Sequence, residues 1–561
     1  MTSRSWAGPR ATSRPRLAGS RSGPSPAPAQ PQVDTGDTEG AGGGIRLTDR
    51  AHIEVSGDGG GTVHIRGSRL VVEGSSQVRA DNTGATDARG GIMIDTGTAT
   101  IASGSEVTTN TFSVGAGGRL VARAGVLEIV GESLLTASVE GKGRGGEVQV
   151  EAGRLLVAGT PGREEFTTAI SSSAVEGTGD AGTVTVKAEQ LEVRGGGEIS
   201  SSTFTPGDAG EVRVEAGRVL VSGEFASITT NAFEGTTFDT GDAGAVLVRA
   251  DDLQIRNFGQ IASESLTAGD AGEVRVEVDN VEIRDSGFVS SSTLLGEGDA
   301  GKVTIEAERL LISGKGQELS TGIFSNSDSL GDAGTVTIRA EQLEVRDGGQ
   351  ISSTTSDEGN AGTVVVRAEK IEIRDDGDIR TSTFAGGHAG SVQIEAGRLL
   401  VAGEGTTISS SAQGGSTGDA GTVALKAEGI EVRNSGEIRS ITFSEGKAGE
   451  VTVETGRLLV DGDGSEAFTG ILTSAAERST GDAGTVTIMA EEIKIRDAGA
   501  ILSSAAGRGR AGDVRVIAGT LLIEDARIGT RGFNNEGGRI DVVADDLIVL
   551  DRAEVTSRVH A

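Results

Sequence analysis

The acidic side chains are the residues of this sequence that come nearest to a catalytic pattern. Asp and Glu together occur 82 times, and adjacent acids stand at Asp251-Asp252, Asp375-Asp376 and Asp545-Asp546. Two carboxylates hydrolyse a glycosidic bond when they lie roughly 5 to 9.5 Å apart on either side of it. The adjacent acids fall at expected turns, and the other acids are scattered along the chain. The sequence therefore predicts no catalytic pair.

Histidine and serine give no pattern of catalysis or metal binding either. His52, His64, His388 and His560 are isolated from one another, which does not match the spacing of zinc ligands. Serine runs such as Ser200–Ser202 have no histidine at a recurring offset, and we expect them to form stacked ladders of mutual hydrogen bonds. The chain has no cysteine and no Gly-Lys-Ser/Thr phosphate loop. We expect no enzyme activity, no cofactor and no dedicated metal site.

The amino-acid composition argues against a nucleic-acid partner and against a membrane span. The 561 residues carry a formal net charge of −31 and include 90 glycines. An acidic surface offers no basic stripe to phosphates, so we expect no nucleic-acid partner. No run of 18 apolar residues is present, so we also expect no membrane span.

The residues that would hold any such site belong to a repeat. The motif Gly-x-Ala-Gly, followed by an alternating apolar segment, occurs 12 times, mostly 28 or 29 residues apart. The second residue is Asp in eight copies and Asn360, His388, Lys447 or Arg510 in the others. Because this position accepts acids, bases and amides, we interpret it as a turn residue that faces solvent. Glycine suits sharp corners, since it allows positive φ and close approach of the backbone.

Each repeat reads as three short strands separated by turns. In one unit the strands are 182–188, 191–194 and 198–204, and alternation sends Val184, Val186, Leu191, Val193 and Ile199 to one face. A fixed period of this size is typical of stacked units that cannot bury their apolar faces alone. The sequence therefore predicts an all-β fold, a right-handed parallel β-helix with one three-strand coil per repeat of about 28 residues.

The chain divides into two parts. Residues 1–40 are rich in Pro, Arg and Ser, and we expect this segment to be disordered because it has too few apolar residues to form a core. Residues 45–561 form the expected β-helix repeat domain.

Some repeats carry extra residues, and we expect these inserts to provide contacts with partners. The longer repeats place Leu156, Leu220, Leu311, Leu400 and Leu459 outward where shorter repeats place Glu or Gln. Insertions in solenoids often lie on the binding face. We predict that inserted loops fold over these leucines, and that Phe166, Phe225, Phe233 and Phe468 are partner-contacting residues of the inserts.

The repeat resembles the filamentous haemagglutinin-like exoproteins of bacterial two-partner secretion. The resemblance lies in Gly-Asp-Ala-Gly-Thr-Val-Thr-Val from Gly179, in Leu191-Glu-Val-Arg, and in Gly67-Ser-Arg-Leu-Val-Val, and it extends over about residues 45–561. It implies a parallel β-helix, export through a partner transporter in the outer membrane, and attachment to surfaces. The chain carries no export signal of the family's kind, so it resembles the shaft region of such an exoprotein.

Together these observations predict a non-enzymatic shaft of a secreted or surface-associated bacterial adhesin. Its expected partners are a glycan or protein receptor on a host or bacterial surface and, through the resemblance, the outer-membrane transporter. The alternative is a carbohydrate-active β-helix enzyme that cleaves polysaccharide. The two differ in whether outward acids and bases converge at one level of the helix.

Overall fold

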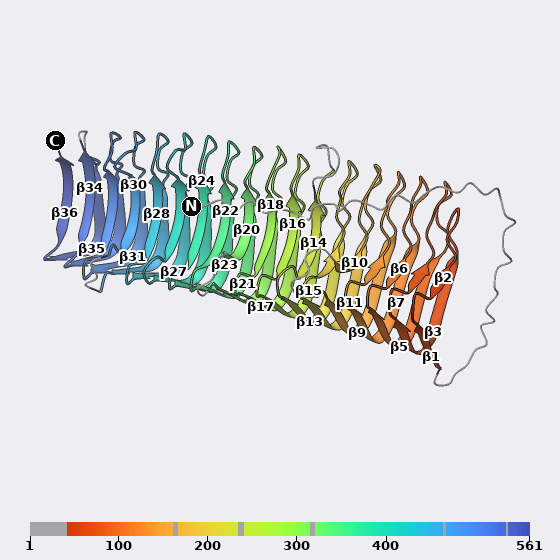
Figure 1. Ribbon diagram of the computed structural model, residues 1–561. Helices are drawn as coiled ribbons and strands as arrows, with labels where there is room; N and C mark the ends of the chain where they lie inside the picture. The colour runs from red at the N-terminus through yellow and green to blue at the C-terminus, as the bar shows by residue number, and fades with distance from the viewer. Residues whose placement is uncertain are drawn as a thin grey trace.

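The computed structural model describes residues 42–160, 167–233, 241–314, 320–463, 467–533 and 537–560. The segment 1–40, expected to be disordered, lies outside the described residues. Every regular element in the described part of the chain is a β-strand, and the strands form a parallel β-solenoid of about 18 turns with roughly 28 residues per turn. Figure 1 shows the strands stacked side by side from the red N-terminal end to the blue C-terminal end. At about 4.8 Å per turn, the rod is on the order of 80 Å long.

The odd-numbered strands form the first sheet. Its members are β1 Gly44–Leu47, β3 Thr62–Val72, β5 Gly91–Ala102, β7 Arg119–Val130, β9 Glu147–Ala158, β11 Val184–Arg194, β13 Val212–Ser222, β15 Val246–Arg256 and β17 Val274–Arg284. They continue with β19 Val303–Ser313, β21 Val336–Arg346, β23 Val364–Arg374, β25 Val392–Ala402, β27 Val423–Arg433, β29 Val451–Asp461, β31 Val486–Arg496, β33 Val514–Glu524 and β35 Ile540–Asp551.

The even-numbered strands form the second sheet. Its members are β2 His52–Glu54, β4 Gln77–Arg79, β6 Glu106–Thr108, β8 Leu134–Thr136, β10 Thr168–Ser171, β12 Gly197–Ser200, β14 Ser227–Ala232, β16 Gln260–Ser265 and β18 Phe288–Thr293. They continue with β20 Thr321–Ser327, β22 Gly349–Thr355, β24 Asp378–Thr383, β26 Thr407–Ala412, β28 Glu437–Thr442, β30 Gly470–Ala475, β32 Ala500–Ala505, β34 Arg527–Phe533 and β36 Glu554–His560.

Each strand pairs in parallel with the equivalent strand of the next turn. Val184 pairs with Val148 on one side and Val212 on the other, so equivalent residues stack along the axis. The first two segments of a repeat, predicted as separate strands, are joined in one strand such as β11. The pairing skips Glu189 between Ala188 and Gln190, which makes a corner without ending the hydrogen-bonded ladder. Sequence periodicity marks the corner but not the continuity across it.

The core fills the inside of the coil, as predicted. Val184, Val186, Val193 and Ile199 have no exposed surface, and Leu191 is 1% exposed. The same inward positions are occupied by Val, Ile or Leu in turn after turn and form one continuous hydrophobic cluster. Stacking therefore buries the apolar face that a single repeat would leave in water.

The Gly-x-Ala-Gly turn packs so closely that no side chain fits. A Cβ on Gly210 would lie 1.8 Å from the carbonyl oxygen of Gly182 in the preceding turn. The inward serine of the second sheet fixes this turn, because Ser201 Oγ donates to the Gly182 carbonyl at 2.6 Å and accepts the Gly210 N–H at 3.0 Å. Ser263 makes the same two bonds, to Gly244 and Gly272. We call this arrangement the serine–glycine contact.

This contact corrects the prediction that the serine runs hydrogen-bond mainly to one another. Direct bonds between inward hydroxyls of successive turns do occur, as Thr293 donates to Ser327 at 3.1 Å and Thr530 to Ser557 at 2.9 Å, but Ser201 and Ser263 bond to glycine backbone instead. The glycine backbone is nearer, because it has no side chain to hold it away. Close approach, one of the two reasons predicted for glycine, is thus the one that applies to these turns.

Positive φ occurs at a different corner, between the two sheets. Gly195 and Gly196 adopt φ of 38° and 75°, and the equivalent residues Asn257 and Phe258 adopt 52° and 66°. Asn, Asp and glycine enter this left-handed region at low cost, whereas a bulky side chain is strained there. The described residues contain no helix that is long and apolar enough to cross a membrane.

Candidate binding surfaces

The second residue of each Gly-x-Ala-Gly turn belongs to an outward column whose members, except Lys447 and Arg510, accept hydrogen bonds. We call it the aspartate column, and it consists of Asp180, Asp208, Asp242, Asp270, Asp299, Asp332, Asn360, His388, Asp419, Lys447, Asp482 and Arg510. Asp270 Oδ1 accepts the backbone N–H of Asp299 at 2.8 Å, and Asn360 Oδ1 accepts that of His388 at 3.0 Å. Its members face solvent, as predicted, and in addition each acceptor holds the next turn in place.

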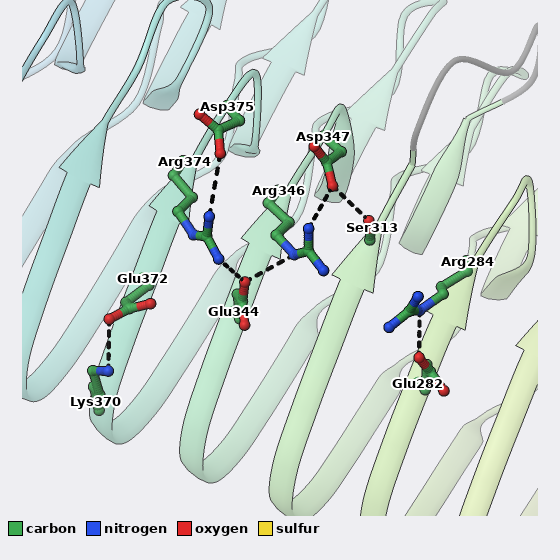
Figure 2. A network of polar contacts seen from close by, with 10 residues as sticks. All are labelled: Glu282, Arg284, Ser313, Glu344, Arg346, Asp347, Lys370, Glu372, Arg374 and Asp375. Carbon is green, nitrogen blue, oxygen red and sulfur yellow. Dashed lines mark hydrogen bonds and ion pairs between the residues drawn. The ribbon is translucent and has the colours of Figure 1, made fainter.

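The outward face of the second half of the odd strands carries a network of ion pairs. Figure 2 shows Glu344 of β21 between two guanidinium groups, Arg346 at 2.8 Å and Arg374 from the next turn. Asp347 lies 2.8 Å from Arg346 and accepts the hydroxyl of Ser313 at 2.9 Å. Because every carboxylate in this network has a cationic partner, none is set apart as a base or nucleophile. Glu344 occupies the outward position that the sequence assigns to Glu or Gln in the shorter repeats.

The first half of the odd strands carries a second column, in which the sign of the charge alternates from turn to turn. We call it the charge ladder, and the strand register places in it Arg66, Asp95, Arg123, Glu151, Lys187, Glu215, Arg249, Glu277, Glu306, Arg339, Arg367, Glu395, Lys426 and Glu454. Seven members are basic and seven are acidic, so their charges sum to zero.

Neighbouring members of the charge ladder form ion pairs along the axis. Arg123 lies 2.9 Å from Glu151, and Lys426 lies 2.8 Å from Glu454. The alternation fails twice, where the acid Glu306 follows Glu277 and where the base Arg367 follows Arg339. Arg275 compensates at the first break, since it pairs with Glu277 and lies 3.5 Å from Glu306. The ladder is therefore neutral in sum, with like charges as neighbours at these two breaks.

An apolar stripe follows the even strands on one rim of the rod. We call it the rim stripe, and it consists of Val175, Phe204, Phe233, Leu266 and Leu294, one residue from each of five successive turns. Each backbone N–H donates to the preceding turn, as Phe204 does to Ala174 and Phe233 to Thr203, both at 2.8 Å. The stripe ends at acidic or polar residues, because Glu140 and Asp328 occupy the same position in the flanking turns.

The centre of the rim stripe is an aromatic pair. The rings of Phe204 and Phe233 are stacked, with centroids 4.8 Å apart and planes inclined by 18°. Phe204 is still 38% exposed and Val175 is 44% exposed. Monomeric proteins rarely expose contiguous apolar surface without a role in binding. The rim stripe is therefore a candidate surface for contact with a partner.

Of the four phenylalanines predicted as partner contacts, the three that the structure describes do not lie together. Phe166 lies outside the described residues. Phe225 is 47% exposed in the turn before β14, whereas Phe233 follows the far end of that strand and stacks on Phe204. Phe468 precedes β30, where its ring would meet a Cβ added to Gly470. Only Phe233 belongs to the rim stripe.

The outward leucines of the longer repeats are half-buried. Leu156, Leu220, Leu311, Leu400 and Leu459 alternate along the axis with polar residues, as Leu311 does between Glu282 and Glu344. Four of the five inserts lie at least partly outside the described residues, at 161–166, 234–240, 315–319 and 464–466, and only the insert at 413–417 is described in full. The expected cover by the loops therefore stays a prediction.

Three carboxylates on the second sheet have perturbed pKa values. Burial raises the pKa of Glu198 and of Glu264, and hydrogen bonds from Ser200 and Ser290 lower each in part. Burial also raises the pKa of Asp378, against the opposing effect of Arg380. These acids stand on β12, β16 and β24, and Glu198 and Glu264 occupy opposite ends of their strands. They do not meet at one level, as paired-carboxylate chemistry requires.

Among the described residues, no group of three or more His, Cys, Asp or Glu side chains is placed to hold a metal ion. His388 serves the aspartate column, where its Nδ1 accepts the N–H of Asp419 at 3.0 Å. No family model, curated protein or solved structure matches this chain.

Sequence reasoning missed the rim stripe and the charge ladder for the same reason. Both are columns across turns, and the inserts vary the number of residues between equivalent positions. Phe204 and Phe233 are visible in the sequence as large residues just after a polar strand, but their stacking follows only from the register of β12 and β14.

Proposed function

We propose that this chain is a non-enzymatic β-helical shaft of a secreted or surface-associated bacterial adhesin, and that it attaches through the rim stripe to a glycan or protein receptor. The resemblance to filamentous haemagglutinin-like exoproteins points in the same direction, and with it comes an outer-membrane transporter as the export partner. The observation that carries the proposal is the stacking of exposed Phe204 on half-buried Phe233 at the surface of an extended rod.

The regularity of the polar surface also supports a binding role over the alternative of a polysaccharide-cleaving enzyme. Charged side chains pair along the axis in the network around Glu344 and in the charge ladder. The four acids whose pKa burial raises, Asp81, Glu198, Glu264 and Asp378, are on separate turns. Aromatic and apolar side chains, by contrast, are typical anchors of recognition surfaces.

Attachment of coated beads tests the proposal. Beads carrying the whole chain are applied to bacterial and host cells, and the bound beads are counted under flow. We expect the double variant Phe204→Ser/Phe233→Ser to lose most attachment, because the anchors of the stripe are removed while the backbone bonds to the preceding turns stay. Treating the target cells with glycosidases or with protease distinguishes the two kinds of receptor.

Phe384→Ser is the matched control. Phe384 occupies the same rim position, where its N–H donates to Thr355, and it is 42% exposed, but its neighbours along the rim are Ser356 and Gln413. Because it is isolated from other apolar residues, its loss should leave attachment unchanged. Equal attachment by the double variant and the wild type would reject the rim stripe as the binding surface.

A further inference from the structure

The charge ladder is a long surface feature among the described residues that escapes the net acidity of the chain. The whole sequence has a net charge of −31, which opposes side-by-side contact of two rods. The ladder, in contrast, has seven bases and seven acids, and its members are well exposed, as Lys187 and Glu215 are with 54% and 48% of their side chains in solvent. Two copies can meet along this face without net repulsion.

We propose that two copies of this chain associate side by side through their charge ladders, antiparallel to one another. A two-fold axis then passes between the turns of β15 and β17, so that Arg249 of each copy faces Glu277 of the other. A two-fold interface of this kind is closed, because the same surface serves both partners and leaves no ladder free.

The order of charges fits this arrangement beyond the axis. In the antiparallel dimer the first four members, Arg66 to Glu151, face the last four, Arg367 to Glu454, in reverse order. The signs run basic, acidic, basic, acidic in both groups, so reversal sets opposite charges against each other at all four levels. Such complementarity of potential selects register and orientation.

Like charges face each other at only two pairs of positions, each of which occurs twice in the dimer. Lys187 faces Arg339, and Glu215 faces Glu306, as a result of the break in alternation between β17 and β23. An antiparallel arrangement shifted by two turns in either direction keeps two such levels but loses opposite pairs at the ends. Full overlap is therefore the favoured register.

The surroundings of the charge ladder suit a protein contact. The adjacent outward column is mainly uncharged and includes the half-buried Thr185, Leu247 and Val365. Two hollows, of about 310 and 720 Å³, lie against the ladder and give side chains of a second copy room to enter.

Sedimentation of the whole chain tests the proposal through a charge swap. At about 20 mM salt we expect a dimer, and at about 500 mM we expect dissociation, because exposed charges are then screened. Arg249→Glu places Glu against Glu277 twice per dimer, and Glu277→Arg places Arg against Arg249 twice. We expect each variant to dimerise at least about tenfold more weakly. An equimolar mixture of the two restores opposite charges at both contacts and should restore the dimer.

The control is Arg194→Glu, which reverses a charge on the outward face of the second half of β11, away from the ladder. It should dimerise like the wild type, and circular dichroism verifies that all variants are folded. A wild-type chain that is monomeric at low salt would overturn the proposal. So would two variants that each weaken the dimer but show no recovery on mixing, since the two residues then do not face each other.

Discussion

The imidazole Nδ1 of His388 accepts a hydrogen bond from the backbone N–H of Asp419 at 3.0 Å. The same bond is made by Asp or Asn in neighbouring turns, as Asp332 does with the N–H of Asn360 at 2.7 Å. The three residue types are interchangeable because each offers an acceptor at the same distance from its backbone. What the repeat preserves at this position is an acceptor for the next turn, and charge is secondary.

Substitutions at Asp270 distinguish the effect of the hydrogen-bond acceptor from the effect of the negative charge. Asp270→Asn keeps an oxygen for the Asp299 N–H, whereas Asp270→Ala removes it. We expect the alanine variant to lose about 1 kcal/mol of local stability and the asparagine variant to lose little. Amide hydrogen exchange at Asp299 measures the difference. Equal exchange in both variants would mean that charge, and not the acceptor, holds the turn.

Lys447 is a natural gap in the aspartate column. Its own N–H donates to Asp419 at 2.7 Å, but an ammonium group offers no acceptor to the following turn. We expect Lys447→Asn to slow exchange of the Asp482 amide and to stabilise the turn by up to about 1 kcal/mol. Lys447→Ala serves as the control, because it removes the charge without supplying an acceptor and should leave that amide as it is.

The serine–glycine contact predicts a sharp contrast at Ser201. Ser201→Ala leaves the Gly210 N–H without its acceptor inside the structure, and we expect a loss of about 1 to 3 kcal/mol. Ser201→Thr retains the hydroxyl and should be tolerated, because Thr381 and Thr473 donate to glycine carbonyls in other turns. Urea unfolding monitored by circular dichroism compares the two. An alanine variant as stable as wild type would show that the contact contributes nothing.

Alanine substitution at two glycines distinguishes a glycine required by close backbone approach from a glycine that merely lowers the stability of a strand. The added methyl of Gly210→Ala would lie 1.8 Å from the Gly182 carbonyl oxygen, so we expect a loss of at least about 3 kcal/mol. Gly429 of β27 has no atom within 4 Å of the added methyl. Gly429→Ala should therefore be neutral or stabilising by up to about 1 kcal/mol. Thermal unfolding of both variants checks the order, and the reverse order would contradict this explanation.

Glu264 predicts a dependence on pH. Because burial raises its pKa in the folded chain above the ordinary 4.5, folding takes up a proton between the two values. The ionised carboxylate therefore destabilises the fold at neutral pH, and this penalty disappears as the pH falls through the folded pKa. We expect Glu264→Gln to raise the melting temperature at pH 7 but not below pH 4.5. Glu358→Gln, at an exposed site, should change it little at either pH.

The features of the fold that depend on local sequence patterns were predictable from the sequence. The period of the repeat, the stacking of turns and the inward set from Val184 to Ile199 follow from alternation and glycine spacing, which are local properties of the chain. The continuity of β11 across its corner was not predictable, because it depends on hydrogen bonds to the neighbouring turns. The role of Ser201 was also missed, since its partners Gly182 and Gly210 lie on other strands.

The candidate surfaces required the register between turns. Lys187 and Glu215 are one short repeat apart, whereas Glu151 and Lys187 are separated by a longer one, so the alternation of charge has no fixed spacing in the sequence. The predicted phenylalanines were chosen for their place in inserts. The aromatic pair that the structure forms joins Phe233 to Phe204, a residue of a short repeat.

Labelling of intact cells is the most direct test of the proposal that the rod acts outside the cell. An antibody raised against the described repeats is applied to cells of the source organism with and without permeabilisation, and bound label is counted by electron microscopy. We expect label on the surface of intact cells or in the medium. The amount of label on the cells should fall when the partners to which the rod attaches are removed by washing. Label that appears only after permeabilisation would contradict the adhesin proposal.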